Sequence, residues 1–353
     1  MDDFQNDNGQ LDTQGSDNLD TNLEGGNDNF EGANTVGTLS TSQYAKYVLA
    51  AADATLTAPE GSTVTTTVEN SIVEYKDGKY VVKGAIAKIG TEIYASLQEA
   101  INAAVDNDVD LENVELQTLD GSYDTYFLVE GKKVTINLNG NTIYGEYTGS
   151  MLVGVFSTDK NGELTLTGNG TVDVTTNTKV YTLITAFNDG SKVTIEDGTY
   201  KLNKASDALI YYGGYTDAAV TVKGGTFTLG NVNTGENGKP WIFNVLGAGD
   251  HHVYVTGGTF NFDINRQHWS NEAVVAETHY TVDNGDNTYT VKEGAEAYVA
   301  TGMLTGPYFV RKNIGYATLA EAIKAAVDYE DSPVGLNKNV TLEETVIING
   351  NGD

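Results

Sequence analysis

Apolar and polar residues alternate in short runs through the middle of the chain, and a glycine-rich corner interrupts each run. The runs are VTINLNGNTI, LTLTGNGTV, VTIEDGTYKL, VTVKGGTFTL and VYVTGGTFNF, which begin at Val134, Leu164, Val193, Val220 and Val253. Their starts lie 30, 29, 27 and 33 residues apart. Strict alternation predicts strands with one buried face, and self-similarity at a nearly constant period predicts a solenoid of stacked rungs.

Equivalent positions of the rungs would form columns inside such a solenoid, because stacked strands lie about 4.8 Å apart and pair their backbones. We expect one internal column from the five residues that begin the runs. We expect a second just past the corner, made of Val172, Tyr200, Phe227 and Phe260. The corners are Gly-Thr pairs at 170–171, 198–199, 225–226 and 258–259, where glycine permits an unusual φ. The apolar segments MLVGVF, TLITAF, ALIYY and WIFNVL supply a further strand for each rung.

A second periodicity, of helical type, occurs in two nearly identical segments, YASLQEAINAAVD from Tyr94 and YATLAEAIKAAVD from Tyr316. Each opens with a capping box, Ser96 with Glu99 in the first copy and the equivalent pair in the second, which starts a helix by satisfying its first N–H groups. Leu97, Ala100, Ile101, Ala104 and Val105 form one apolar stripe. We expect the first helix to cover the first rung and protect its edge.

Shorter patterns lie around these segments. Residues 71–84 and 280–294 each alternate around an Asp-Gly or Asn-Gly turn and predict β-hairpins. Residues 41–56, TSQYAKYVLAAADATL, are rich in alanine and predict a short helix, the expected element of self-association. The resulting division is an arm at 1–40, a short helix and linker at 41–68, a hairpin at 69–88, a first solenoid module at 89–279, a hairpin and linker at 280–312, and the start of a second module at 313–353.

Residues 1–40 contain nine acidic residues and no Lys or Arg, a composition that favours an extended segment. Single apolar residues are spaced through it, and we interpret them as anchors that dock on a partner. They are Phe4, Leu11, Leu19, Leu23 and Phe30.

Composition narrows the classes of partner. The net charge of −29 argues against nucleic acid and against an anionic membrane surface, since both need a basic footprint. With no cysteine, disulfides and thiolate metal sites are excluded. No apolar run is long enough to span a membrane, and the first residues lack the pattern of a secretory signal.

The glycine-threonine corners and the Y-A-[ST]-L-x-E-A-I-x-A-A helix resemble right-handed parallel β-helix modules, which are pectate-lyase-like in architecture. Such modules occur in long surface proteins of gut bacteria and in phage fibre proteins. The resemblance covers about residues 70–353, and its motifs are specific for the module, with no bearing on activity. The expected fold is therefore dominated by β-structure: a right-handed parallel β-helix solenoid with an N-terminal capping helix and a β-hairpin, preceded by an extended polar arm.

Catalytic patterns are weak. Lyases of the pectate type use clustered carboxylates for Ca²⁺ and an arginine base, and neither Arg266 nor Arg311 is expected on a strand that faces an acidic cluster. Hydrolases need two carboxylates about 5–9 Å apart, for which Asp173 and Glu196 are candidates, while Asp197 suits a corner. The segment DNDVDLE at 106–112 has alternating acids but reads as a turn after the helix. We expect no catalytic residue, metal or cofactor.

Binding is better supported than catalysis. The longest insertions between rungs are 230–241 and 263–272, which gather Trp241, Arg266, His268 and Trp269. Aromatic rings beside polar groups stack on sugars or anchor protein partners. The alternative is that Trp241 packs in the core and that Trp269 covers the end of the stack.

These features together predict a non-catalytic structural virion protein, a head fibre or capsid decoration of a gut bacteriophage. Residues 1–40 would attach it to a capsid or other virion protein, and its solenoid would project from the capsid surface as a homo-oligomer, with carbohydrate as a possible ligand. A bacterial cell-surface adhesin is the alternative, and a polysaccharide lyase or hydrolase is the second alternative.

Overall fold

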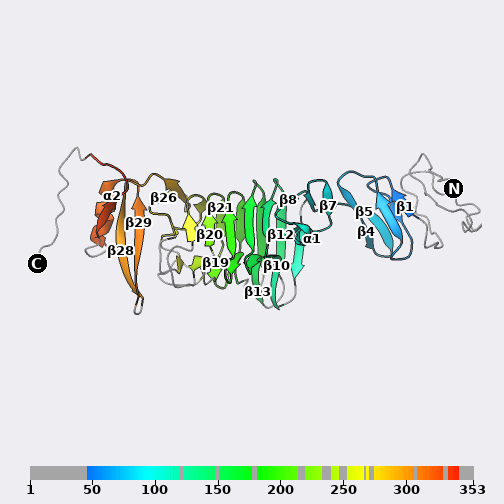
Figure 1. Ribbon diagram of the computed structural model, residues 1–353, viewed down its shortest axis with the longest axis horizontal. Coiled ribbons are helices and arrows are strands. Elements are labelled where there is room, and N and C mark those ends of the chain that lie inside the picture. The colour runs from blue at the N-terminus through cyan, green and yellow to red at the C-terminus, as the bar shows by residue number, and fades with distance from the viewer. Residues whose placement is uncertain are drawn as a thin grey trace, which may run out of the picture. The chain divides into compact units, whose positions relative to one another are not determined.

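The computed structural model of the chain is built mainly of β-strands and forms two compact units, residues 1–100 and 101–353 (Figure 1). It describes residues 46–113, 115–119, 122–147, 151–176, 181–213, 219–232, 240–245, 253–265, 268–269, 274–305, 308–328 and 333–341. The predicted arm at 1–40, with Phe4, Leu11, Leu19, Leu23 and Phe30, lies outside the described residues. Its anchoring role stays a prediction.

The described part of the first unit is a small β-structure. Its strands are β1 (Lys46–Leu49), β2 (Thr55–Leu56), β3 (Thr63–Thr66), β4 (Ser71–Lys76), β5 (Lys79–Gly84), β6 (Ala87–Ile89) and β7 (Glu92–Tyr94). The predicted hairpin at 71–84 is confirmed as β4–β5, and its turn residues Asp77 and Gly78 both have positive φ. Tyr80 packs in the core of this unit, and its hydroxyl donates to the carbonyl of Pro59 at 3.0 Å.

The helix predicted at 41–56 is wrong over its described part. β1 and β2 occupy this segment, and β1 pairs in parallel with β3. Tyr47 and Leu49 are buried while Lys46 is exposed, which is the alternation of a strand. Partners distant in sequence outweighed the helix propensity of the alanines, because propensity is a weak bias beside tertiary packing.

The second unit carries the solenoid strands, the C-terminal hairpins and a helix. Its strands are β8 (Asp108–Leu111), β9 (Glu115–Leu119), β10 (Ser122–Glu130), β11 (Lys133–Asn137), β12 (Thr142–Tyr147), β13 (Met151–Asp159), β14 (Glu163–Thr167), β15 (Thr171–Thr176), β16 (Ile184–Phe187), β17 (Lys192–Ile195), β18 (Thr199–Leu202), β19 (Ala208–Gly213), β20 (Ala219–Val222), β21 (Thr226–Leu229), β22 (Trp241–Val245), β23 (Val253–Val255), β24 (Thr259–Phe260), β25 (His268–Trp269), β26 (His279–Asp283), β27 (Tyr289–Glu293), β28 (Ala297–Thr305), β29 (Tyr308–Tyr316) and β30 (Val334–Leu336). Helix α1 (Leu97–Ala103) spans the boundary between the units, and α2 (Leu319–Asp328) follows β29.

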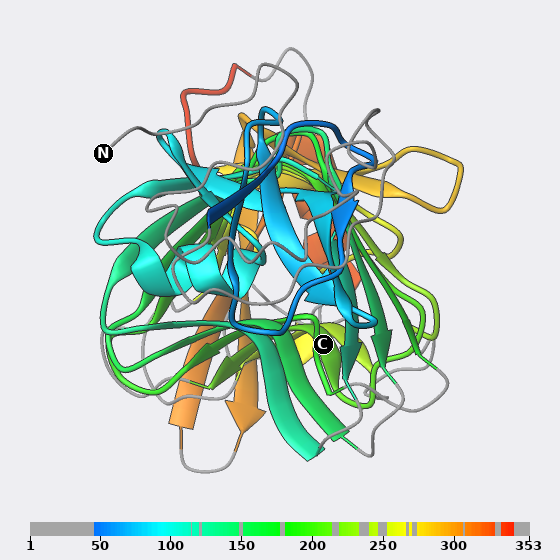
Figure 2. The ribbon, with the colours of Figure 1, turned by 90° about the vertical axis from the view of Figure 1, so that its right-hand side faces the viewer.

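The strands β8 to β25 form a parallel β-solenoid, as predicted. Successive rungs add to three sheets, so that β11, β14, β17, β20 and β23 pair in sequence, as do β12, β15, β18, β21 and β24. The third sheet runs β10, β13, β16, β19, β22 and β25. Seen end-on, the successive turns superimpose along one path (Figure 2).

Both predicted internal columns are confirmed. Val134, Leu164, Val193, Val220 and Val253 are register partners from rung to rung, and all are buried. The rings of Tyr200 and Phe227 stack with centroids 5.2 Å apart, and those of Phe227 and Phe260 with centroids 4.8 Å apart. The hydroxyl of Tyr200 donates to the carbonyl of Asp197 at 2.8 Å, and burial raises the pKa of this phenol far above its ordinary value.

Glycine is required at the corners for two different reasons. Gly198, Gly225 and Gly258 have φ of 108°, 98° and 100°, which other residues rarely adopt. Gly170 has no positive φ, but a Cβ there would lie 2.4 Å from the carbonyl oxygen of Asn141. At position 170, glycine is therefore required because the adjacent rung leaves no room for a Cβ.

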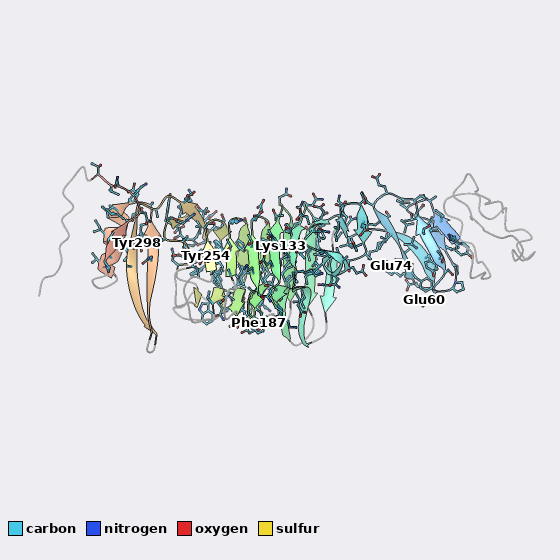
Figure 3. All side chains as sticks on the ribbon, viewed as in Figure 1. Glu60, Glu74, Lys133, Phe187, Tyr254 and Tyr298 are labelled. Carbon is cyan, nitrogen blue, oxygen red and sulfur yellow. The ribbon has the colours of Figure 1, made fainter. Side chains whose placement is uncertain are left out.

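Three outward side chains mark the surface of the solenoid: Lys133, Phe187 and Tyr254 (Figure 3). The third sheet differs from the other two, since every residue of β19 and β22 is buried. Both faces of these strands are covered.

The C-terminal part of the second unit repeats a hairpin-and-helix arrangement. β26 and β27 form the predicted hairpin, and β28 and β29 form a second, longer one that the sequence did not suggest. Helix α2 packs on β28, where Ala297, Val299 and Ala322 form a small core. β30 pairs antiparallel with β28.

Candidate functional site

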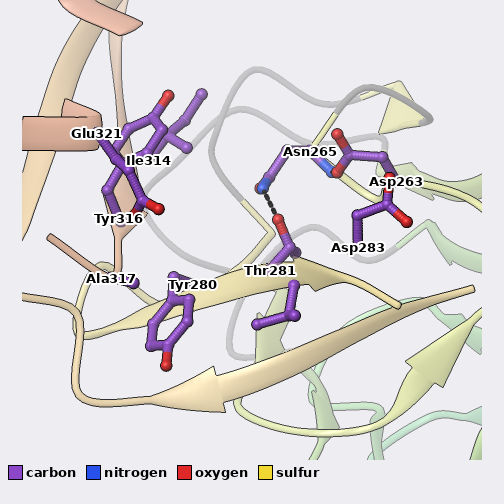
Figure 4. Close-up of a pocket in the computed structure, with 11 residues that line it drawn as sticks. Asp263, Asn265, Tyr280, Thr281, Asp283, Ile314, Tyr316, Ala317 and Glu321 are labelled. Atoms are coloured by element: carbon purple, nitrogen blue, oxygen red, sulfur yellow. Dashed lines mark hydrogen bonds between the residues drawn. The ribbon is translucent and has the colours of Figure 1, made fainter. Parts of the chain in front are cut away.

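A cavity of about 430 Å³ lies in the second unit, at the C-terminal end of the solenoid (Figure 4). Four segments line it: the loop after β24, strand β26, the end of β29 and the first turn of α2. The lining residues are Asp263, Asn265, Tyr280, Thr281, Val282, Asp283, Ile314, Gly315, Tyr316, Ala317 and Glu321.

One glycine brings two walls of this cavity together. A Cβ on Gly315 would lie 2.0 Å from the carbonyl oxygen of His279, so β29 approaches β26 more closely than a side chain allows. The first copy of the helix segment has Ile93 at the equivalent place before the shared tyrosine. The close approach is therefore a property of the second copy.

The three carboxylates of the cavity are each held by a nearby backbone N–H. Asp263 accepts from the N–H of Asn265 at 3.0 Å, and Asp283 accepts from that of Gly285 at 2.8 Å. Glu321 accepts from the N–H of Thr318 at 3.2 Å, as part of the capping box of α2. In each case the bond fixes one carboxylate oxygen and so orients the group.

A hydrogen bond across the cavity joins its loop to its strand. The amide of Asn265 donates to the hydroxyl of Thr281 at 2.9 Å (Figure 4). This bond ties the segment that leaves the last solenoid rung to the hairpin that follows.

The lining is acidic. It contains three carboxylates, and none of its described members is Lys, Arg or His. Lys292 is the cross-strand partner of Tyr280 but does not line the cavity. His279 precedes Tyr280, and burial lowers the pKa of its ring against the opposing influence of Glu293.

The residues predicted to bind ligand do not gather at this cavity. Trp241 is 5% exposed in β22, where its ring packs in the interior, as the alternative reading anticipated. His268 and Trp269 form β25, which pairs in parallel with Phe243 and Asn244 of β22 at the end of the third sheet. Arg266 lies outside the described residues. Asp263 and Asn265, from the start of the same insertion, do reach the cavity.

The acidic residues considered for catalysis are engaged elsewhere. Asp173 lies 3.7 Å from the ammonium of Lys201, and Glu196 lies 3.1 Å from that of Lys223, each pair joining successive rungs. Asp197 accepts from the N–H of Gly198, the predicted role of a corner former. Arg311 lies in β29, and its side chain is outside the described residues.

The acidic segment after α1 is a strand, whereas the sequence predicted a turn. β8 occupies most of it, and Asp110 accepts from the amide of Asn137 in the next rung at 3.0 Å. Alternation in this segment reflects two faces of a strand. Among the described residues, no group of three or more His, Asp or Glu side chains is arranged to hold a metal ion.

A row of buried polar side chains lies at the third sheet. The amide of Asn244 donates to Asp207, and the hydroxyls of Thr182 and Thr185 lie 3.1 Å apart. All four side chains are buried, so a ligand has no access to them. The row is part of the packed interior.

The tyrosines of the cavity were missed because they serve recognisable structural patterns. Tyr280 begins the second hairpin and Tyr316 begins the second helix segment. One signal was available: Gly315 replaces an apolar residue between two otherwise repeated patterns. A small residue at such a position indicates a close approach of two segments.

No protein-family model, no curated protein and no solved structure matches this chain. None of the helices in the described ranges has the length and apolar character needed to cross a membrane.

Proposed function

We propose that this chain is a non-catalytic structural and adhesive protein whose solenoid presents a ligand-binding cavity. The observation that carries the proposal is the rung-to-rung register of the solenoid, in which two buried columns continue between β11 and β24. A parallel solenoid of this kind is a rigid support, because each rung is held by its neighbours along the stack.

The charged surface of the solenoid supports the same reading. Lysines of one rung pair with carboxylates of the preceding rung at Lys192–Glu163, Lys201–Asp173 and Lys223–Glu196. Exposed pairs contribute about 0–1 kcal/mol each, so their role is to balance charge and favour the register. Carboxylates engaged in this way are poorly suited to catalysis at a shared substrate.

Within this class we propose a head fibre or capsid decoration of a gut bacteriophage, attached through residues 1–40. The support is compositional: an acidic segment with spaced apolar residues precedes a unit that has a core of its own. Such a segment gains order by docking its apolar side chains on a partner surface. A bacterial cell-surface adhesin uses the same solenoid and cavity and is the second candidate.

Incorporation into particles tests the attachment. The full-length chain, a variant lacking residues 1–40, and a full-length variant with Leu11, Leu19 and Leu23 changed to Ser would be compared by quantitative blotting of purified particles. We expect both variants to fold, by circular dichroism, and to be lost from particles. Normal incorporation of the Ser variant would show that Leu11, Leu19 and Leu23 are not the anchors. Normal incorporation of the deletion variant would show that residues 1–40 do not attach the protein to the particle.

The alternatives give different outcomes. Labelling with gold-conjugated antibody would place the protein on particles or on bacterial cells, and label on cells alone would favour the adhesin. Release of unsaturated products or new reducing ends from acidic polysaccharides would favour the lyase or hydrolase and overturn the non-catalytic proposal.

A further inference from the structure

We propose that the cavity beside β26 and α2 binds a saccharide that carries a protonated amino group. This inference rests on the proposed adhesive function and names the ligand class of its site. It follows from the charge of the lining, from the nature of its uncharged members and from its size.

The lining of the cavity is negatively charged. Asp263, Asp283 and Glu321 line one cavity, and no lysine, arginine or histidine is among the lining residues that the structure describes. An anionic sugar is repelled there, and an ammonium group is attracted.

Two of the carboxylates are oriented so that one oxygen of each can accept a hydrogen bond from a ligand. One oxygen of Asp283 accepts from the N–H of Gly285, and one oxygen of Glu321 accepts from that of Thr318. The second oxygen of each group has no further hydrogen bond among the described residues and can accept from a ligand. Charge-assisted hydrogen bonds of ammonium to carboxylate are about twice as strong as neutral ones.

The uncharged lining favours a sugar over a simple amine. Tyr280 and Tyr316 provide aromatic surface, and Asn265 and Thr281 provide polar groups beside it. Aromatic faces pack against the C–H surface of a pyranose, while amides and hydroxyls bond its hydroxyl groups. A small amine would use the carboxylates alone.

Size is consistent with this ligand. A cavity of 430 Å³ falls at the small end of the range of about 300–1,000 Å³ for ligand sites, which suits one or two sugar rings. It opens where the loop after β24, β26, β29 and α2 converge, at the C-terminal end of the solenoid (Figure 4). A sugar at the end of a longer glycan can enter such an opening.

The test is a binding titration of the purified full-length chain by calorimetry, with three disaccharides that differ in one group. They are the β-1,4 disaccharide of glucosamine, its N,N′-diacetyl form and a disaccharide of galacturonic acid. We expect the amino sugar to bind at least tenfold more tightly than the acetylated sugar, and the uronic acid to show no binding. Equal affinity for the first two, or tighter binding of the uronic acid, would overturn the proposal.

Variants locate the binding. The double variant Asp283→Asn with Glu321→Gln keeps both backbone hydrogen bonds, since each amide oxygen still accepts, and removes two charges. We expect it to lower the affinity for the amino sugar about tenfold and to leave that for the acetylated sugar unchanged. Asp286→Asn is the matched control, because this carboxylate lies in the same hairpin turn, accepts from Thr288 and does not line the cavity.

Two further outcomes are decisive. Binding unchanged in the double variant but lost in Asp286→Asn would place the site elsewhere and refute the cavity. A lysine-containing peptide that binds as tightly as the amino sugar would refute the saccharide. These assays use no particle, so they can fail while attachment through residues 1–40 stands, and they can succeed while that attachment fails.

Discussion

The two copies of the helix segment have nearly the same sequence and different surroundings. In the first copy Leu97, Ala100, Ile101 and Ala104 have 0% exposure. Of their counterparts in α2, only Ala322 is fully buried, while Leu319, Ile323 and Ala326 are half-buried. Both helices begin with the same capping box, so local sequence starts the helix and its surroundings decide how much of the apolar stripe is covered.

A lysine accounts for part of this difference. The ammonium of Lys132, from the turn before β11, donates to the carbonyl oxygens of Ile101, Asn102 and Ala104 at 2.8, 2.8 and 3.2 Å. The last carbonyls of a helix have no partner within it, and a cation there is also attracted by the negative end of the helix dipole. This bond ties the end of α1 to the solenoid rung that follows. The part of the chain described after α2 has no such lysine contact.

The strand after each helix shows the same contrast. β8 pairs in parallel with β11, and its Val109 and Leu111 are fully buried. β30 pairs antiparallel with β28, and its Leu336 is 55% exposed. The strand after the first helix is thus buried because a further rung, which begins with β11, stacks on it.

The largest expected effect comes from truncating equivalent isoleucines. Ile101→Ala should lower the free energy of unfolding by about 2–5 kcal/mol, because it leaves a cavity in a fully packed site. Ile323→Ala should cost about 1 kcal/mol, since this side chain is already half-exposed. Chemical denaturation with hydrogen exchange at the helix amides measures both. Equal costs would show that α1 and α2 have the same packing.

The next largest effect is expected from removing the hydrogen bonds of Lys132 to the end of α1. Lys132→Met should lower the free energy of unfolding by about 1–3 kcal/mol, because three carbonyl groups, two of them in partly buried hydrogen bonds, lose a charged donor. Faster hydrogen exchange should be confined to the end of α1 and leave α2 unchanged. Lys133→Met is the matched control, since Lys133 is exposed and should change stability by less than about 0.5 kcal/mol. Exchange in α1 that does not respond to Lys132→Met would contradict the role given to this residue.

The capping boxes should give a smaller and equal effect in both copies. Ser96→Ala and Thr318→Ala each remove the hydroxyl that accepts from the N–H of Glu99 or Glu321 at 3.2 Å. The cost should be about 0.5–2 kcal/mol for each. Hydrogen exchange in the first turn of each helix is the measurement. A large difference between the copies would mean that tertiary packing, rather than the cap, holds the first turn.

The smallest effect is expected where both copies expose the same side chain. Val105→Ser and Val327→Ser should each change the free energy of unfolding, measured by thermal denaturation, by less than about 0.5 kcal/mol, because both valines are exposed. A clear loss of stability at Val327 alone would reveal a partner surface on α2.

Much of the fold could be predicted because its signals are local and repeated. The alternation in the runs from Val134 to Val253 specifies buried and exposed faces, and the spacing of the Gly-Thr corners specifies the rung. The two capping boxes and the Asp77-Gly78 turn are likewise readable, because each motif satisfies its own backbone groups.

The helix expected at 41–56 failed for the opposite reason. Its apolar residues also fit a strand of period two, and the choice depended on pairing with β3, which lies further along the chain. The burial of Trp241 could not be predicted for the same reason. A tryptophan at the end of an insertion has no local pattern that decides whether its ring faces the interior or the solvent.

The sequence by itself determined the rungs, their corners, the internal columns and the starts of both helices, because these depend on nearest neighbours and short repeats. Tertiary structure alone decided which copy of the helix is buried, where Trp241 packs and that Asp263, Tyr280, Tyr316 and Glu321 meet around one cavity. The cavity depends on segments up to 58 residues apart converging past Gly315, and contacts of that range have no periodicity along the chain.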